Sequence, residues 1–315
     1  MGDPGALDVS AISAAFVRRS TALCPDQAGF AQRLIADLQP IRWKLEWYLP
    51  WWLGQSLGVD PDVVREIVLG NVLGLAALRL RDDQADGEIA PADRDNAHVL
   101  SAALYGEAVG VYQNQFPPGS PFWPSFAKAM SQWERATDAH APNSAAASGT
   151  RPRASRFHVI ARRGAPLKVC ATALCLLGDR GDIIPSLHVA LDHALAAWVL
   201  FDDANDWEAD LAAGRWNAFV ARLAKAPQDP SRRDENRAAV LIAMLSNDLV
   251  RGYYAAIGRE AVRAAAISDQ LGLRPFSAHL RQFGRHSGER GAERHNHYRA
   301  LTERATVLLF GDTVG

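Results

Sequence analysis

The sequence is poor in cysteine, and its formal charges nearly cancel. Its 315 residues include three cysteines, which form neither a CxxC pair nor a cluster with histidine: Cys24, Cys170 and Cys175. That pattern argues against a disulfide scaffold or a zinc finger, and the apolar settings of the thiols predict buried, reduced cysteines in a cytoplasmic protein. A net charge of −1 provides no long-range attraction to nucleic acid, so we expect no nucleic-acid partner.

Several common signatures are also missing. The first residues lack a basic region followed by an apolar stretch, so we expect no signal peptide. The apolar stretch 183–201 is interrupted by His188, Asp192 and His193, which predicts that it does not span a membrane. We find no Walker loop, GxGxxG, HExxH or di-iron ExxH pair. Any phosphate chemistry therefore needs local basic residues or metal ions.

The sequence does contain strong helical periodicity. Segments rich in Ala, Leu and Arg repeat apolar residues at three- and four-residue spacing, and no alternating strand pattern competes with them. We expect helices over 25–38, 42–54, 60–83, 94–113, 121–138, 166–178, 183–206, 231–257 and 276–310. They predict a single all-α domain over 1–315. The small, polar stretch 138–156 is predicted to be a mobile loop within it.

The first chemical motif is a DDxxD cluster at the end of a predicted helix. Asp82, Asp83 and Asp86 follow a long apolar pattern, and Gly87 is a plausible stop. Asp82 and Asp86 share a helix face, where two carboxylates near the C-terminus repel each other and oppose the helix dipole. A divalent cation between them would make the arrangement favourable, and Mg²⁺ suits such ligands. The alternatives are solvated surface acids and a degenerate calcium loop.

A second DDxxD follows about 120 residues later. Asp202, Asp203 and Asp206 repeat the spacing, and Asp210 extends the same face by one turn. The preceding AAWVLF is too apolar for a solvated face. Two such clusters, each closing a long apolar helix, favour a metal site over surface acids.

The pair of motifs resembles the two aspartate-rich motifs of trans-prenyltransferases and related class I terpene synthases. The resemblance implies a helical bundle with a central active-site cavity, in which both motifs hold Mg²⁺, three ions in that superfamily, against a prenyl diphosphate substrate. It also leaves a homodimer open. By the same resemblance, Lys168, Arg215, Arg294 and Tyr298 would contact the diphosphate. For Arg294 and Tyr298 the alternative is a solvated basic helix face. Trp198 and Phe201 would border the apolar pocket in which a carbocation reacts.

The departures from that family pattern bear on the reaction. Where elongating enzymes carry paired arginines after the first motif, this chain has Pro91-Ala92, with Arg94 beyond. Their N-terminal basic segment has no clear match, and Arg42 and Lys44 lie in a loosely similar setting. Loss of this second-substrate signature favours a terpene synthase, a carbon–oxygen lyase that acts on one allylic diphosphate. A prenyltransferase and a helical scaffold with degenerate motifs are the alternatives.

A row of tryptophans precedes the first motif. Trp43, Trp47 and Trp51 recur at four-residue spacing on one predicted helix face. Such a stripe is typical of a hydrophobic core, and the alternative is the wall of a carbocation cavity.

Overall fold

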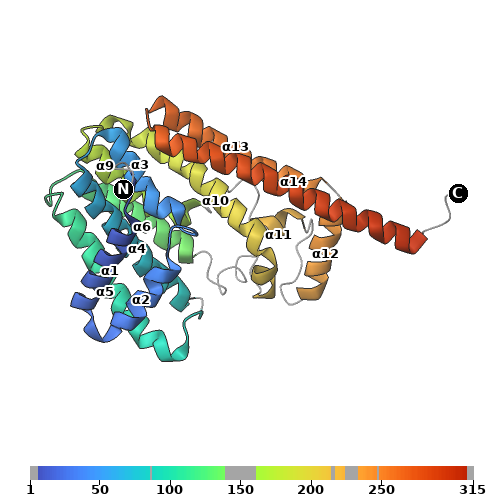
Figure 1. Ribbon diagram of the computed structural model, residues 1–315, viewed down its shortest axis with the longest axis horizontal. Helices are drawn as coiled ribbons and strands as arrows, with labels where there is room; N and C mark the ends of the chain where they lie inside the picture. The colour runs from blue at the N-terminus through green and yellow to red at the C-terminus, as the bar shows by residue number, and fades with distance from the viewer. Residues whose placement is uncertain are drawn as a thin grey trace. The chain divides into compact units, whose positions relative to one another are not determined.

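The protein is built from helices. The computed structural model describes residues 6–85, 87–138, 161–213, 217–223, 233–246 and 248–310. Helices make up 86% of these residues, which include no strand, and this confirms the all-α class (Figure 1). Asp138 ends a helix, whereas the rest of the predicted loop 138–156 lies outside the described residues, as do Asp86 and Arg215.

The chain divides into two compact units. Unit 1 comprises residues 1–141, 163–188 and 270–276, and unit 2 comprises 142–162, 189–269 and 277–315. The first DDxxD motif lies in unit 1 and the second in unit 2, so each motif is described within its own unit. The single domain over 1–315 stays a prediction.

Unit 1 is assembled around helices α3 and α4. Its helices are α1 (Val9–Leu23), α2 (Ala28–Asp37), α3 (Lys44–Leu57), α4 (Pro61–Ala85), α5 (Arg94–Gln113), α6 (Phe122–Asp138) and α9 (Leu167–Leu177), with 3₁₀ turns at Pro25–Gln27, Pro91–Asp93, Ala161–Gly164 and Gly181–Ile183. Helix α4 packs against α5, α3 and α9. Trp47 and Trp51 of α3 are buried, and the Trp47 indole donates to the Leu38 carbonyl at 2.6 Å. For these two residues the core interpretation of the tryptophan stripe is therefore confirmed.

Unit 2 contains the remaining helices. These are α10 (Ile184–Ala212, in this unit from Val189), α11 (Ala218–Leu223), α12 (Arg233–Ser246), α13 (Leu249–Gln270) and α14 (Arg274–Phe310, in this unit from Ser277). Leu200 and Trp207 of α10 share one buried cluster with Phe219 of α11, Tyr254 of α13 and Phe283 of α14. Helices α13 and α14 run side by side over much of their length (Figure 1).

Most predicted helices match the structure, but α10 continues to Ala212 beyond its predicted end at 206, and α13 continues to Gln270 beyond the predicted end at 257. The prediction missed α1, whose first turn is capped by the Asp8 carboxylate accepting from the Ala11 amide at 2.9 Å. It also missed the six-residue α11, and it merged α12 with the start of α13. The break falls between Ser246 and Leu249, in a Ser-Asn-Asp run of residues that favour helix caps over helix interiors.

The three cysteines are free and buried, as predicted from their apolar settings. Burial, the largest cause, raises the pKa of the Cys175 thiol to about 12.

One segment of the described residues, 181–212, is long and apolar enough to cross a membrane, with a mean hydropathy of 1.5 in its best window. Half of that window is buried inside the structure, and a buried core helix meets the same criterion. The absence of a membrane span stays a prediction.

Candidate functional site

The second aspartate motif lies inside α10, which continues for more than a turn beyond it. Asp202 and Asp206 are exposed, whereas Asp203 and Asp210 are half-buried. At 3.6 residues per turn, the four side chains leave the helix within an arc of about 100°. The acidic face therefore has an outer edge open to solvent and an inner edge turned toward the protein.

The inner edge of this face is occupied by the start of α11. The Asp203 Oδ2 atom accepts from the Ala218 amide at 2.7 Å. The buried Asn217 amide donates from Nδ2 to the Asp203 carbonyl at 2.9 Å and to Asp210 Oδ2 at 2.8 Å. Its Oδ1 accepts from the Val220 amide at 2.9 Å and so caps α11. Asp203 and Asp210 thus help to fold α11, a role that their spacing did not reveal.

Helix α14 brings Arg294 to the same motif from another side. The Arg294 guanidinium donates to the carbonyl oxygen of Ala204, and its Nη2 donates to Asn205 Oδ1 at 3.2 Å. Both partners lie within the DDAND sequence of the motif. The two helices α13 and α14 approach closely here, because a Cβ on Gly291 would lie only 2.5 Å from that of Tyr254.

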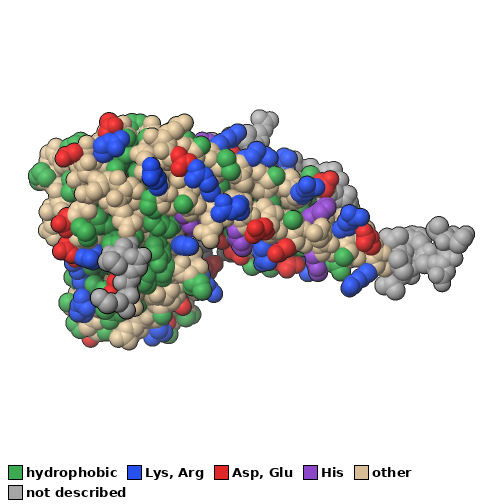
Figure 2. All heavy atoms as spheres, turned by 45° about the horizontal axis from the view of Figure 1, so that its top comes forward, with side chains coloured by type: hydrophobic (Ala, Val, Ile, Leu, Met, Phe, Trp, Pro, Cys, Tyr) green, Lys and Arg blue, Asp and Glu red, His purple; other side chains and the backbone are tan. Residues whose placement is uncertain are grey.

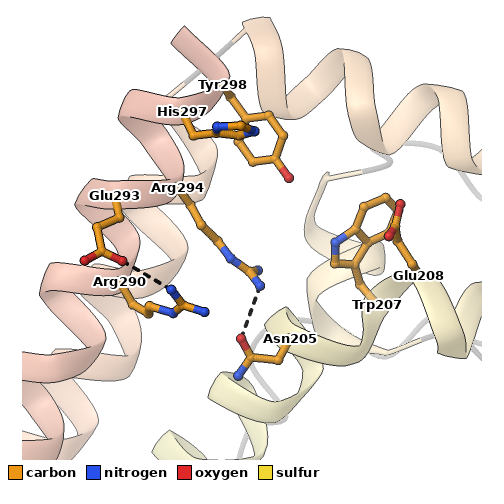
Figure 3. A pocket seen from close by; sticks show the side chains of 8 residues that line it. All are labelled: Asn205, Trp207, Glu208, Arg290, Glu293, Arg294, His297 and Tyr298. Atoms are coloured by element: carbon orange, nitrogen blue, oxygen red, sulfur yellow. Dashed lines mark hydrogen bonds and ion pairs between the residues drawn. The ribbon is translucent and has the colours of Figure 1, made fainter. Parts of the chain in front are cut away.

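Arg294 lines a cavity of about 340 Å³ within unit 2 (Figure 3). The walls come from α10 and α14 and are formed by Asn205, Trp207, Glu208, Arg290, Glu293, Arg294, His297 and Tyr298. In Figure 3 the Arg294 side chain reaches across toward Asn205, while the Tyr298 hydroxyl points into the space opposite Trp207 and Glu208. Arg290 pairs with Glu293 at 3.2 Å. The cavity is therefore polar and carries both signs of charge.

Three tyrosines in this region have raised pKa values. Burial is the largest cause for each of them, Tyr253, Tyr254 and Tyr298. The negative charge of Asp203 raises the pKa of Tyr253 further, whereas the nearby Arg294 partly offsets the effect of burial on Tyr298. The phenols are therefore neutral at physiological pH, and Tyr298, which lines the cavity, can donate a hydrogen bond to an anion there.

The first aspartate motif lies at the very end of α4. Gly87 has a φ of +71°, and the amides of Gly87 and Glu88 donate to the carbonyls of Gln84 and Asp83 at 3.2 and 2.8 Å. This is a Schellman-type ending, and Gly87 is the predicted stop of the helix. The Arg79 Nε atom contacts both Asp83 oxygens, at 2.9 and 3.1 Å. Asp82 is half-buried beside it.

The other predicted binding residues fall into both units. Lys168 is buried in the first turn of α9 in unit 1, while Arg42, Lys44 and Arg94 are exposed. Trp198 and Phe201 lie in unit 2. Trp198 stacks on Phe283, with ring centroids 4.3 Å apart, and Phe201 meets the same ring edge-on at 5.4 Å.

The residues that the structure describes, which exclude Asp86, include no group of three His, Cys, Asp or Glu side chains that could hold a metal ion. Asp202 and Asp206 nevertheless fit Mg²⁺, because that ion uses one or two carboxylates and takes its other oxygens from water and phosphate. Asp83 fits less well, since Arg79 holds both of its oxygens.

Sequence reasoning missed part of this site. It did not identify Asn205, Glu208 and Arg290 as cavity residues, nor Asn217 as the link between Asp203 and Asp210. The four-residue steps from Arg290 to Arg294 and Tyr298 are a helical signal that points to Arg290. Comparison with known proteins adds no relative: no protein-family model, curated protein or solved structure matches the chain.

Proposed function

We propose that the chain is a magnesium-dependent class I terpene synthase that ionises one allylic prenyl diphosphate. The main observation in its favour is that Arg294 forms hydrogen bonds with two residues of the second aspartate motif. A cationic fork of donors and a face of carboxylates lie on neighbouring sides of one stretch of α10. A diphosphate needs both kinds of group, because cations bind its oxygens directly and carboxylates bind them through Mg²⁺.

The predicted site residues in unit 2 have surroundings that permit the roles proposed for them. Asp202 and Asp206 would hold Mg²⁺ at the exposed edge, where the ion supplies Lewis-acid stabilisation of the departing diphosphate. Arg294 and Tyr298 would donate to the diphosphate oxygens, and the raised pKa of Tyr298 keeps its phenol protonated for this. The rings of Trp198 and Phe201 would present apolar, electron-rich faces to a carbocation.

We propose that the first motif also binds Mg²⁺. Asp82 and Asp86 are its candidates, with Lys168 as a further donor to diphosphate. A cavity shared by the two motifs stays a prediction, as do the diphosphate contact of Arg215 and the isoprenoid synthase type of the fold.

A second candidate function has specific observations in its favour. Asp83 pairs with Arg79, and Asp203 caps α11, so one aspartate of each motif has a structural role. A helical scaffold that keeps aspartates only for folding would explain these contacts. On that reading Asp202 and Asp206, which are exposed, are solvated surface acids.

The deciding experiment is to incubate the purified protein with Mg²⁺ and prenyl diphosphates of ten to twenty carbons. Each substrate is tested with and without isopentenyl diphosphate. Hydrocarbons and alcohols are detected by gas chromatography–mass spectrometry, and released diphosphate is measured separately. We expect a hydrocarbon or terpene alcohol from a single allylic substrate, and no product in EDTA.

Other products would assign the protein differently. A longer prenyl diphosphate that forms only with isopentenyl diphosphate would identify a prenyltransferase and leave the metal proposal intact. No turnover of any substrate, together with no effect of Mg²⁺ on thermal stability in the presence of diphosphate, would favour the scaffold.

A further inference from the structure

A groove between α13 and α14 is separate from the cavity described above. It encloses about 620 Å³ and is bordered by arginines from both helices: Arg259, Arg263, Arg281 and Arg285. Small residues form its floor, namely Ala255, Gly258 and Gly284. Figure 2 shows Lys and Arg side chains gathered along the face that these two helices present. We call this feature the arginine groove.

Two of the four arginines already have acidic partners. Arg263 pairs with Glu260 at 2.8 Å, and Arg281 pairs with Asp269. Arg259 and Arg285 are exposed and form no ion pair with any residue that the structure describes. They belong to different helices, so each wall of the groove contributes one cation. The groove therefore favours a ligand that brings negative charge to both walls.

The floor of the groove favours a ligand that has an apolar ridge between its negative charges. The Gly258 carbonyl oxygen lies 3.7 Å from where a Cβ on Gly284 would be, so the two backbones are close and little side-chain volume lies over them. Val262 borders the same space with 59% of its surface exposed. A free phosphate would use the arginines but not the floor, and a flat lipid surface would rest on the rim.

We propose that the arginine groove docks an acidic amphipathic helix of a partner protein. Small residues in a groove allow a third helix to approach to the usual interaxial distance of about 8–10 Å. Its apolar stripe would lie over Gly258 and Gly284, and its flanking carboxylates would meet Arg259 and Arg285. This is recognition of a helix in a groove, with anchors at three- and four-residue spacing. The inference does not depend on the proposed enzymatic activity.

The test uses a fluorescein-labelled synthetic helix and the full-length protein. The probe has about 18 residues, with Leu and Ala at three- and four-residue spacing and Glu on both flanks. Two control peptides carry Lys in place of Glu, or the same residues in an order that destroys the apolar stripe. Fluorescence anisotropy should show binding of the acidic amphipathic probe alone, weakened as salt is raised.

Variants locate the binding on the protein. Arg259→Ala with Arg285→Ala should weaken the affinity about tenfold, the expected effect of losing two charge pairs. The matched double variant, Arg18→Ala with Arg304→Ala, removes two other exposed arginines and should stay within about twofold. Val262→Glu places a carboxylate beside the floor and should abolish binding. Circular dichroism should show all three variants folded.

Several outcomes would overturn the proposal. Equal binding of the acidic and basic probes would show that charge does not select the ligand. No binding of the acidic probe, or an equal loss of affinity in both double variants, would also reject it. Phosphatidylglycerol vesicles that bind through Arg259 and Arg285 while the acidic probe does not would assign the groove to a lipid surface instead.

Discussion

Helices α4 and α10 carry the same DDxxD spacing in different surroundings. At the first motif the helix stops at Gly87, and Arg79 holds the middle carboxylate within the same helix. At the second motif α10 continues, and contacts from α11 and α14 reach it across sequence separations of 15 and 90 residues. Spacing determines which carboxylates share a face, whereas tertiary contacts determine which of them are exposed to a ligand.

The largest expected effect tests whether the two motifs serve one reaction. Asp202→Asn and Asp82→Asn should each lower turnover by at least about 100-fold, on the scale of losing a charge-stabilising group. If both serve one metal cluster, the double variant should be little worse than either single variant, because residues that act as a unit are non-additive. Steady-state kinetics at saturating Mg²⁺ measures this.

The control is Glu289→Gln, which removes an exposed carboxylate of α14 that belongs to neither motif and should retain turnover. Independent, multiplicative losses in the double variant would separate the motifs. Full turnover by Asp202→Asn would remove the second motif from the reaction.

A second comparison contrasts the structural contacts of the two motifs. Asn217→Ala should lower the free energy of unfolding by about 2 kcal/mol, because it removes a helix cap and two partly buried hydrogen bonds. Arg79→Ala should cost about 0.5 kcal/mol, as for a partly exposed ion pair four residues apart on a helix. Urea unfolding followed by circular dichroism compares them. Equal losses would mean that the second motif is no more embedded than the first.

Arg294 reaches the second motif from a separate helix, whereas Arg79 contacts the first motif from within α4. Arg294→Gln should lower kcat/KM about tenfold, since a neutral amide cannot replace a guanidinium at phosphate. Arg290→Gln, in the same cavity but paired with Glu293, should stay within about threefold. Arg294→Lys should recover part of the loss if charge matters. A fall in thermal stability without any change in kcat/KM would make Arg294 purely structural.

The smallest expected effect concerns the stop at the first motif. Gly87→Ala should cost about 1 kcal/mol, because a residue with a Cβ is strained at a φ of +71°. Thermal unfolding measures the loss. If Gly87→Ala leaves the thermal stability unchanged, the end of α4 adjusts to the new side chain. The position of Asp83 is then less fixed than its ion pair with Arg79 suggests.

Local patterns were sufficient to predict most of the helices. The segment 94–113 matches α5 at both ends, because its apolar spacing and flanking turn residues agree. Helix α11 could not be predicted in the same way, since it has six residues and its start depends on Asp203, fifteen positions earlier. A short helix held by long-range hydrogen bonds leaves no periodic signal.

In the candidate site, too, residue spacing predicted some features, and others depend on contacts between distant segments. The shared faces of Asp202 with Asp206 and of Arg294 with Tyr298 follow from residue spacing alone. Two facts did not: that Arg294 reaches Ala204, and that Asn217 joins Asp203 to Asp210. Both depend on how separate helices pack in unit 2, which depends on side-chain volumes at many positions together.

The hydrogen bonds of Asn217 also constrain how this sequence can change over time. Deamidation or mutation to aspartate would replace the Nδ2 donor with an oxygen facing the Asp210 carboxylate and the Asp203 carbonyl. Two acceptors would then face each other in a buried setting. Residue 217 can therefore become acidic only if residue 210 ceases to be, and in descendants of this chain the two positions should change together.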